Sequence, residues 1–230
     1  MVRCGSIIGN RVNADMEEAA AMVDPDFMLN VLINEEGRIG YAVAGHYQQA
    51  HEAGKLYLEK TARITIDRKV PFVVMSAGGY PKDIDFYQST KALSSAREAV
   101  AEKGIILFLC QCVDGVGHTE VSSLLQDFPT HRSREIEMRR AFTVSKFAGF
   151  LASQMAQDYQ IYCVTDLDSA VLEGIGFRVF RHVDEAMTAI EDQFGKGLET
   201  YVIPSASSIL PGVVLPAKPK RAEKINCNFK

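Results

Sequence analysis

Three side chains that could hold an anion fall on one face of a predicted helix. Lys91 follows Tyr87 by four residues and Gln88 by three, and a helix places residues at these spacings side by side. A phenol, an amide and an ammonium group can all donate hydrogen bonds, and the ammonium group adds a positive charge. The pattern predicts either a solvated helix face or a surface that holds an anionic substrate against a partner domain.

The periodicity of this helix, predicted over residues 84–102, indicates which way these side chains point. At about 100° per residue, one stripe collects the residues that should pack on a sheet: Phe86, Ser89, Leu93, Ala96 and Val100. Tyr87, Gln88 and Lys91 fall almost opposite. We therefore expect them to point away from the core of their own domain, near the positive N-terminal end of the helix.

Two loops should lie at the same edge of the predicted sheet. Each follows a continuous apolar run, over residues 70–75 and 105–110. In parallel sheets, ligands bind outside the carboxyl ends of the strands. We therefore take five loop residues as candidates to face a substrate or cofactor: Gly78, Gly79, Tyr80, Asp114 and His118. A Gly-Gly turn is also common where no ligand binds, so this loop alone indicates little.

The elements around these loops alternate between strand and helix from residue 69 onward. Further strands are expected over 161–164, 177–180 and 200–203, the last of them final, with a long helix near 133–157. Continuous apolar strands that alternate with helices are typical of an α/β, Rossmann-like fold, in which helices cover both faces of a mostly parallel sheet. We assign this domain to residues 69–210, followed by a flexible tail at 211–230.

Residues 1–68 are predicted to form an N-terminal extension packed on the main domain. Its pattern indicates a helix over 14–23, a β-hairpin from 27–33 and 39–44, a second helix over 46–59 and a short edge strand at 62–66. The Asn-Glu-Glu-Gly connection between the two apolar runs is typical of a hairpin turn.

Composition narrows the function classes. The chain has 230 residues, 47% of them hydrophobic, and a net charge of −4, which leaves no excess of Lys and Arg for a general nucleic-acid binder. Its five cysteines form no disulfide framework, and no apolar run is long enough for a membrane helix. No apolar leader segment follows Met1. We therefore expect a reduced, cytoplasmic chain without nucleic-acid or membrane partners.

No metal site is expected in this chain. The five histidines do not have the spacing of a zinc or nickel cluster, and only His118 falls on the predicted ligand edge. The others are interpreted as surface or helix-end residues: His46, His51, His131 and His182. Cys110 and Cys112, interpreted as facing one side of a strand, are expected in the core rather than on a metal.

The segment 76–91 resembles a family signature. Its sequence, Ser-Ala-Gly-Gly-Tyr-Pro-Lys-Asp-Ile-Asp-Phe-Tyr-Gln-Ser-Thr-Lys, is similar to the Gly-Gly-Tyr-Pro-x-Asp…Tyr-Gln-x-x-Lys motif of the nickel-dependent lactate racemase family. Supporting pieces occur in the same order: Gly9-Asn10, Asp26-Phe27, Ala44-Gly45 before His51-x-Ala-Gly54, and Asp114-Gly115-x-Gly117. The similarity extends over about residues 5–205, which corresponds to the C-terminal half of that family.

This resemblance implies a two-domain enzyme that interconverts 2-hydroxy-acid stereoisomers by hydride transfer to a nickel-pincer nucleotide. In the family, the N-terminal half holds that cofactor and the acid–base histidines. The resemblance makes Tyr87, Gln88 and Lys91 the catalytic, substrate- and cofactor-facing residues of the C-terminal half. The expected partners are an N-terminal catalytic half and a small 2-hydroxy acid. Nothing before Met1 supplies that half, so this chain alone is expected to be inactive and to hold no cofactor.

Two other interpretations of the function remain open from the sequence. The chain could be a non-catalytic Rossmann-like module that binds an anion or a nucleotide, or a domain with no separate role. Nucleotide binding has no direct support, because the sequence lacks a Gly-x-Gly-x-x-Gly or Walker pattern. The identity of the hydroxy acid is left open, because both halves would form the walls of its pocket.

Overall fold

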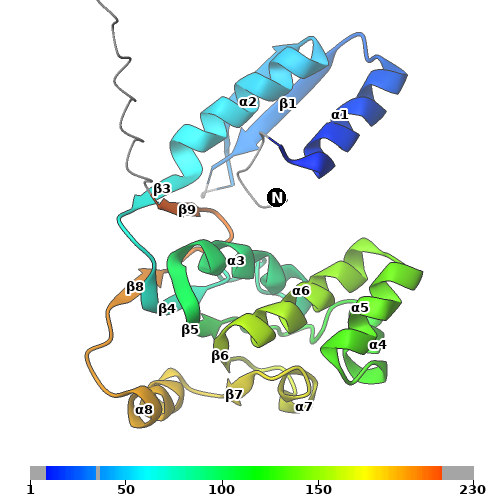
Figure 1. Ribbon diagram of the computed structural model, residues 1–230. Coiled ribbons are helices and arrows are strands. Elements are labelled where there is room, and N and C mark those ends of the chain that lie inside the picture. Colours follow the sequence, from blue (N-terminus) through cyan, green and yellow to red (C-terminus); the bar gives the residue numbers. More distant parts are fainter. Residues whose placement is uncertain (1–8, 35–36, 214–230) are drawn as a thin grey trace, which may run out of the picture.

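The chain begins with a helix–hairpin–helix unit in this computed structural model, which describes residues 9–34 and 37–213 (Figure 1). The unit consists of α1 (Arg11–Val23), the antiparallel strands β1 (Met28–Ile33) and β2 (Ile39–Gly45), and α2 (Tyr47–Ala62). The Asn10 side chain caps α1 by accepting hydrogen bonds from the backbone N–H groups of Val12 and Asn13. Asp24 takes a left-handed conformation where the helix ends. The predicted hairpin and both predicted helices are confirmed.

A five-stranded parallel sheet forms the centre of the main domain. Its spatial order is β7-β6-β5-β4-β8, and every adjacent pair is parallel. The strands are β4 (Val70–Ser76), β5 (Val100–Leu109), β6 (Gln160–Val164), β7 (Arg178–Phe180) and β8 (Thr200–Ile203). The predicted strands at 70–75, 105–110 and 161–164 are therefore parallel neighbours, as expected for an α/β fold.

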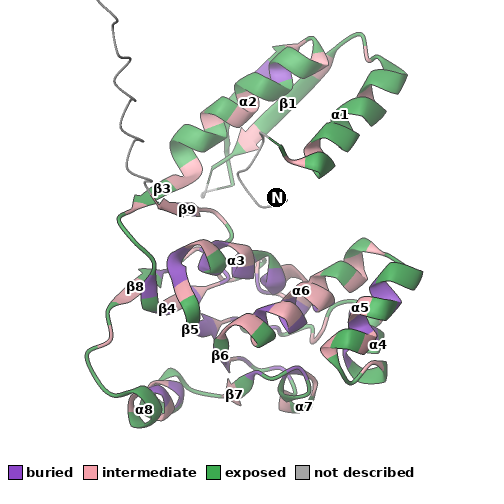
Figure 2. Cartoon of the chain, viewed as in Figure 1, coloured by how far each residue is buried: buried purple, intermediate pink, exposed green. Residues whose placement is uncertain are grey.

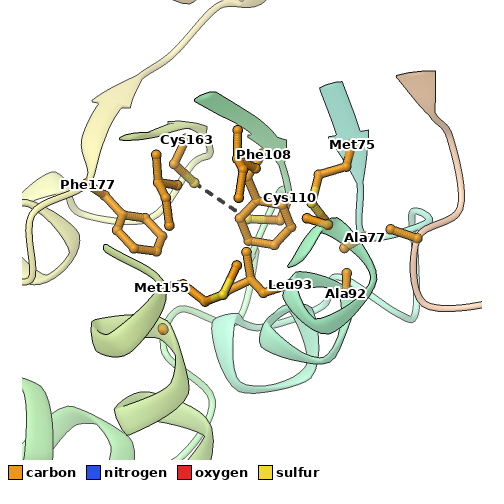
Figure 3. Packing of buried hydrophobic residues seen from close by; sticks show 14 of the residues in the cluster. Met75, Ala77, Ala92, Leu93, Phe108, Cys110, Met155, Cys163 and Phe177 are labelled. Atoms are coloured by element: carbon orange, nitrogen blue, oxygen red, sulfur yellow. Dashed lines mark hydrogen bonds between the residues drawn. The ribbon is translucent and has the colours of Figure 1, made fainter. Parts of the chain in front are cut away.

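Helices cover both faces of this sheet. One face packs against α3 (Phe86–Ala99) and α6 (Val144–Asp158), and Figure 3 shows Phe108 from the sheet among Leu93 and Met155 from these helices. The other face packs against α8 (Val183–Phe194) through a smaller cluster that contains Leu107, Tyr162 and Ile190. The remaining helices are α4 (Thr119–Asp127), α5 (His131–Arg140) and α7 (Ser169–Glu173). The Rossmann-like α/β prediction is confirmed.

A second, two-stranded parallel sheet lies where the chain enters and leaves the main domain (Figure 1). It pairs β3 (Arg63–Ile66) with β9 (Leu210–Val213). The short strand predicted at 62–66 is confirmed, whereas the prediction that 200–203 is the last strand is wrong. Residues 211–213, which we assigned to the tail, lie in β9, and residues 214–230 fall outside the described residues. The domain boundaries stay predictions.

The end of α3 differs from the sequence prediction. The helix ends at Ala99 rather than at residue 102, because Val100 turns into β5 and pairs with Val70. Gly104 explains how the strand continues after this point. A Cβ atom there would lie 2.7 Å from Val100 Cγ2 and 2.8 Å from the Pro71 carbonyl oxygen, so only glycine fits the irregular register. The helix-forming residue types around 97–102 conceal this early strand.

The long helix predicted near 133–157 is two helices, and α4 before them was not predicted. Thr143 interrupts the helical run by accepting a hydrogen bond from Lys146 N, which caps α6. Thr130 caps α5 in the same manner, together with Ser133. Threonine N-caps that the hydrophobic pattern does not reveal therefore divide this region.

Burial differs between the two parts of the chain (Figure 2). Buried residues concentrate in the central sheet and in the helices packed on it, whereas the helix–hairpin–helix unit is mostly exposed. Within its described residues, α1 buries no side chain at all. No helix in the described part of the chain has the length and apolarity needed to cross a membrane.

Candidate functional site

The candidate site is built around the first turn of α3. Asp85 caps this helix, because its Oδ1 accepts a hydrogen bond from Gln88 N at 2.6 Å. Sequence reasoning missed this role, although the Asp-x-x-Gln spacing from Asp85 to Gln88 resembles a capping box. The cap fixes where the helix begins, and it therefore fixes the direction in which Tyr87, Gln88 and Lys91 leave the backbone.

Backbone hydrogen bonds join the two predicted site loops. The carbonyl oxygen of Ile84 accepts from Asp114 N at 2.8 Å, and Tyr87 N donates to the Val116 carbonyl at 3.1 Å. Asp83 adds two contacts, as its backbone carbonyl accepts from Cys112 N and its buried carboxylate accepts from Gln111 N at 3.2 Å. The loops after β4 and β5 therefore lie side by side at one edge of the sheet, as predicted.

Four of the predicted site residues form one group. Lys91 Nζ donates a hydrogen bond to Gln88 Oε1 at 2.5 Å and lies 5.7 Å from the centroid of the Tyr87 ring. The Tyr87 ring is 5.9 Å from the ring of His118, measured between centroids. Tyr87 and Gln88 are half-buried, and Lys91 is exposed. The structure thus brings together a phenol, an amide, an ammonium group and an imidazole from two elements.

His118 has a structural role that the sequence pattern did not indicate. It caps α4, because its Nδ1 accepts a hydrogen bond from Glu120 N at 3.3 Å. Glu120 in turn accepts from Thr143 Oγ1 at 2.8 Å, which ties the start of α4 to the start of α6. This cap holds the His118 ring beside Tyr87.

The buried face of α3 is wider than the predicted stripe. Thr90, Ala92, Ser95 and Ala99 are buried as well as the predicted residues. The reason is a segment after β8 that lies along the helix, where Ser95 Oγ bonds to the carbonyl oxygens of Ala206 at 2.6 Å and Ile209 at 2.8 Å. Gln88 and Lys91 remain outside this wider face. Tyr87 is half-buried and packs against the main core cluster, so the expectation that it points away from the core is wrong.

The other loop candidates lie at the same edge but outside this group. Gly78 and Gly79 have φ angles of +112° and +73°, which favour glycine. A Cβ atom on Gly78 would lie 3.0 Å from Lys82 Cδ, so the lack of a side chain at Gly78 leaves room for the Lys82 side chain beside the turn. Tyr80 is 78% exposed, and Asp114 is exposed with its backbone N–H bonded to Ile84. Their roles in binding stay predictions.

A cleft of about 530 Å³ lies beside Lys91, between α3 and the helices of the extension. Lys91, Ser94 and Ser95 line one side, and α2 contributes His51 and Lys55 on the other. The walls are completed by Asn10, Asn13, Met16, Leu58, Glu59, Ala62, Arg63 and residues 207–210. We interpreted His51 as a surface residue, and it does lie in a helix, but it shares this cleft with Lys91. No periodicity signal in the sequence indicated that pairing.

No metal centre is found among residues 9–34 and 37–213, where no group of three or more His, Cys, Asp or Glu side chains could hold an ion. Cys110 and Cys112 are buried in the core, as predicted. β5 ends at Leu109, so both cysteines lie after the strand, and the interpretation that they face one side of it is wrong. The hydrogen bond of Cys112 to Cys110, together with burial, raises the pKa of the Cys112 thiol far above its ordinary value.

Comparison with known families identifies the domain that carries this site. Residues 66–211 match the family of the lactate racemase C-terminal domain. This chain belongs to that family. It is 34% identical over 115 residues to the lactate racemase of Thermoanaerobacterium thermosaccharolyticum, covering 50% of this chain and 27% of that protein. It is 24% identical over 214 residues to the lactate racemase of Lactiplantibacillus plantarum, covering 90% of this chain and 50% of that protein.

Solved structures show the same fold. The lactate racemase apoprotein from Thermoanaerobacterium thermosaccharolyticum superposes with a TM-score of 0.81 at 23% identity, covering 88% of this chain and 50% of that one. A protein from Thermotoga maritima superposes with a TM-score of 0.62 at 12% identity, covering 90% of this chain and 55% of that one. The chain therefore spans about half the length of these solved relatives, and the matched share is larger than residues 66–211, so it reaches into the residues before them.

Proposed function

We propose that this chain is the substrate-side half of a lactate racemase-like enzyme that interconverts the stereoisomers of a small 2-hydroxy acid. In this proposal Lys91, Gln88 and Tyr87 are its catalytic residues. The observation that carries the proposal is their convergence on the first two turns of α3, inside a domain that belongs to the lactate racemase C-terminal family.

Lys91 would bind the carboxylate of the substrate. Within the described residues its ammonium group contacts an amide and an aromatic ring rather than a carboxylate, so its charge is not already neutralised. The Asp85 cap and the Val116 carbonyl fix the backbone of the turn that carries Gln88 and Tyr87. A positive charge and two polar groups held in this manner can orient the substrate before reaction, with little reorganisation.

The donor groups of this site fit an anion, not a metal ion. An ammonium, an amide, a phenol and one imidazole do not make a nickel coordination set, and the described residues offer no other cluster. In our proposal the nickel-pincer nucleotide is held by the N-terminal half, and when bound it supplies the hydride acceptor. The residues of this chain would position the carboxylate and hydroxyl of the substrate and shield that reacting face from water.

A fused polypeptide tests this proposal. The N-terminal half of the Lactiplantibacillus plantarum lactate racemase, joined to this chain and loaded with the nickel cofactor, should convert L-lactate or a related 2-hydroxy acid into a mixture of stereoisomers. Chiral chromatography measures the product. A folded, cofactor-loaded fusion that racemises none of a panel of 2-hydroxy acids contradicts the proposal. Saturable binding of lactate or a nucleotide to the isolated chain, with no turnover by the fusion, favours a binding module instead.

A further inference from the structure

We propose that residues 11–34 and 37–45 form a docking surface for the N-terminal half of a lactate racemase-type polypeptide. The surface has two parts, the bare face of the β1–β2 hairpin and an apolar stripe along α1. This inference rests on the proposed function, because it names the partner that the enzyme requires, and it adds where that partner binds.

The hairpin has one covered face and one bare face. On the covered face, α2 packs closely, with the rings of Tyr41 and Tyr57 stacked at 4.1 Å between centroids and Val43 only 7% exposed. Side chains on the other face alternate with these along the strands. That face is made of apolar residues alone: Leu29, Val31 and Ile33 from β1, opposite Ala42 and Ala44 from β2.

The apolar side chains on the bare face are unusually exposed to solvent. Leu29 is 68%, Val31 39% and Ile33 57% exposed, and both alanines are exposed as well. A hairpin of two strands with a single covered face is marginally stable in water. A contiguous apolar face of this kind commonly marks a protein–protein contact.

Helix α1 presents a second bare surface. Val12, Met16, Ala19 and Val23 recur at i, i+4, i+7 and i+11, which places them on one stripe of the helix. Val12 is 50% and Val23 77% exposed, and Met16 is 65% exposed although it also lines the cleft beside Lys91. Figure 2 shows α1 almost entirely in the colour of exposed residues. Short helices depend on packing of their apolar face for stability, so this stripe also lacks its partner surface.

The comparisons indicate what covers these surfaces. The match to the C-terminal domain family begins at residue 66, so α1 and the β1–β2 hairpin precede that domain. The lactate racemase of Lactiplantibacillus plantarum nevertheless matches 90% of this chain with only 50% of its own length. The solved apoprotein matches 88% of this chain with 50% of its length. The extension is thus a segment that these enzymes share. We infer that the unmatched half of such an enzyme is the partner that covers the bare surfaces.

Paired stability measurements on the isolated chain and on the fused polypeptide test this docking surface. Leu29→Lys and Val23→Lys should leave the urea unfolding midpoint of the isolated chain nearly unchanged, because both side chains are already exposed. In the fusion, each substitution should lower the unfolding midpoint, since a charge would then enter an apolar contact. Each should also reduce the protection of the backbone amides of residues 28–45 from hydrogen exchange. Val202→Lys, at a residue 68% exposed on β8, is the control and should behave alike in both contexts.

Each other outcome has a defined meaning. Equal effects of Leu29→Lys in the fusion and in the isolated chain, or no added protection of residues 28–45 in the fusion, overturn the docking surface. So does a dimer of the isolated chain, detected by sedimentation, that Leu29→Lys dissociates, because a second copy is then the occupant. A fusion that shows docking but no racemisation contradicts the proposed function alone. Racemisation without the expected docking effects contradicts the docking surface alone.

Discussion

The Asp85 carboxylate fills the space that a side chain at Gly117 would occupy. A Cβ atom on Gly117 would lie 2.2 Å from Asp85 Cγ and 2.5 Å from Oδ2, and Gly117 has a φ angle of +85°. The cap of α3 and the loop that carries His118 are thus in direct contact. The geometry of the candidate site depends on this contact, because the capped helix presents Tyr87 and the loop presents His118.

Gly117→Ala should therefore lower the free energy of unfolding by about 2–4 kcal/mol, the sum of left-handed backbone strain and overpacking. Gly195→Ala is a matched control, because Gly195 also has a φ angle of +85° and has no atom within 4 Å of its added Cβ. In the control, only the backbone strain should act, and it should lower the free energy of unfolding by about 1 kcal/mol. Urea unfolding followed by circular dichroism measures both. Equal losses in the two variants would show that the Asp85 contact does not matter.

Lys91→Met should separate stability from activity. The side chain is exposed and its loss should change the free energy of unfolding by less than about 0.5 kcal/mol. In the fused polypeptide the same change should reduce kcat/KM by the equivalent of about 2–4 kcal/mol, the range for one preorganised electrostatic contact. Activity is compared after nickel content has been matched between variants.

Lys196→Met is the control for this change, because Lys196 has a side chain that is 83% exposed and lies after α8, paired with Glu191. It should alter neither stability nor activity. If Lys91→Met and Lys196→Met retain the same kcat/KM, Lys91 belongs to a solvated helix face and has no role in catalysis.

The α/β fold could be predicted from sequence because the apolar strands are continuous and the helices between them have clear periodicity. The parts that could not be predicted depend on contacts between distant segments. β9 is a short run that contains Pro211 and Gly212, and it becomes a strand only because Arg63–Ile66 lies beside it. Similarly, Val100 leaves a run of helix-forming residues because it pairs with Val70.

The candidate site also combines features that a local pattern predicts with features that depend on contacts between distant segments. Helical spacing alone predicts that Tyr87, Gln88 and Lys91 are neighbours, and strand order predicts that the two loops meet. The contact of His118 with Tyr87 depends on the capping of α4, and the place of His51 in the cleft beside Lys91 depends on how the extension sits against α3. These relationships join elements that are far apart in sequence, so no local pattern encodes them.

The carboxylate of Glu137 should make the stability of the chain sensitive to acid. Its Oε2 accepts from Arg140 Nε at 2.8 Å and its Oε1 from Lys146 Nζ at 2.7 Å. The hydrogen bond from Arg140, followed by that from Lys146, holds the pKa of Glu137 below its ordinary value of 4.5. A carboxylate whose pKa is lowered by folding stabilises the folded state above that ordinary value, and this stabilisation is lost as the pH falls through the lower, folded-state pKa.

The melting temperature should therefore decrease as the pH falls below about 4.5. Glu137→Gln should melt at a lower temperature than the parent at pH 7 and should show a smaller decrease on acidification, because the titrating group is gone. Glu191→Gln is the control, as its ion pair with Lys196 is longer, at 3.5 Å, and exposed. Parallel melting curves for the parent and Glu137→Gln between pH 3 and pH 7 would contradict this account.

Arg134 should be among the most sensitive positions for stability outside the sheet. Its side chain is only 2% exposed, and burial lowers the pKa of its guanidinium group. Its partners are neutral oxygens on different elements: Ser153 Oγ at 3.0 Å and the carbonyl oxygens of Leu125, Pro129 and Gly174 at 3.3–3.4 Å. One side chain thus joins the ends of α4 and α7 to α6.

Arg134→Met removes the charge but leaves these acceptors buried without their donor, so it should lower the free energy of unfolding by about 2–4 kcal/mol. Arg134→Lys should also destabilise, because one ammonium group cannot reach acceptors that the planar guanidinium spans. Arg132→Met, on the exposed side of the same helix with a side chain 74% exposed, should cost less than about 1 kcal/mol. Urea unfolding of the three variants checks this. If Arg134→Met unfolds at the same urea concentration as Arg132→Met, the buried contacts do not hold the three helices together.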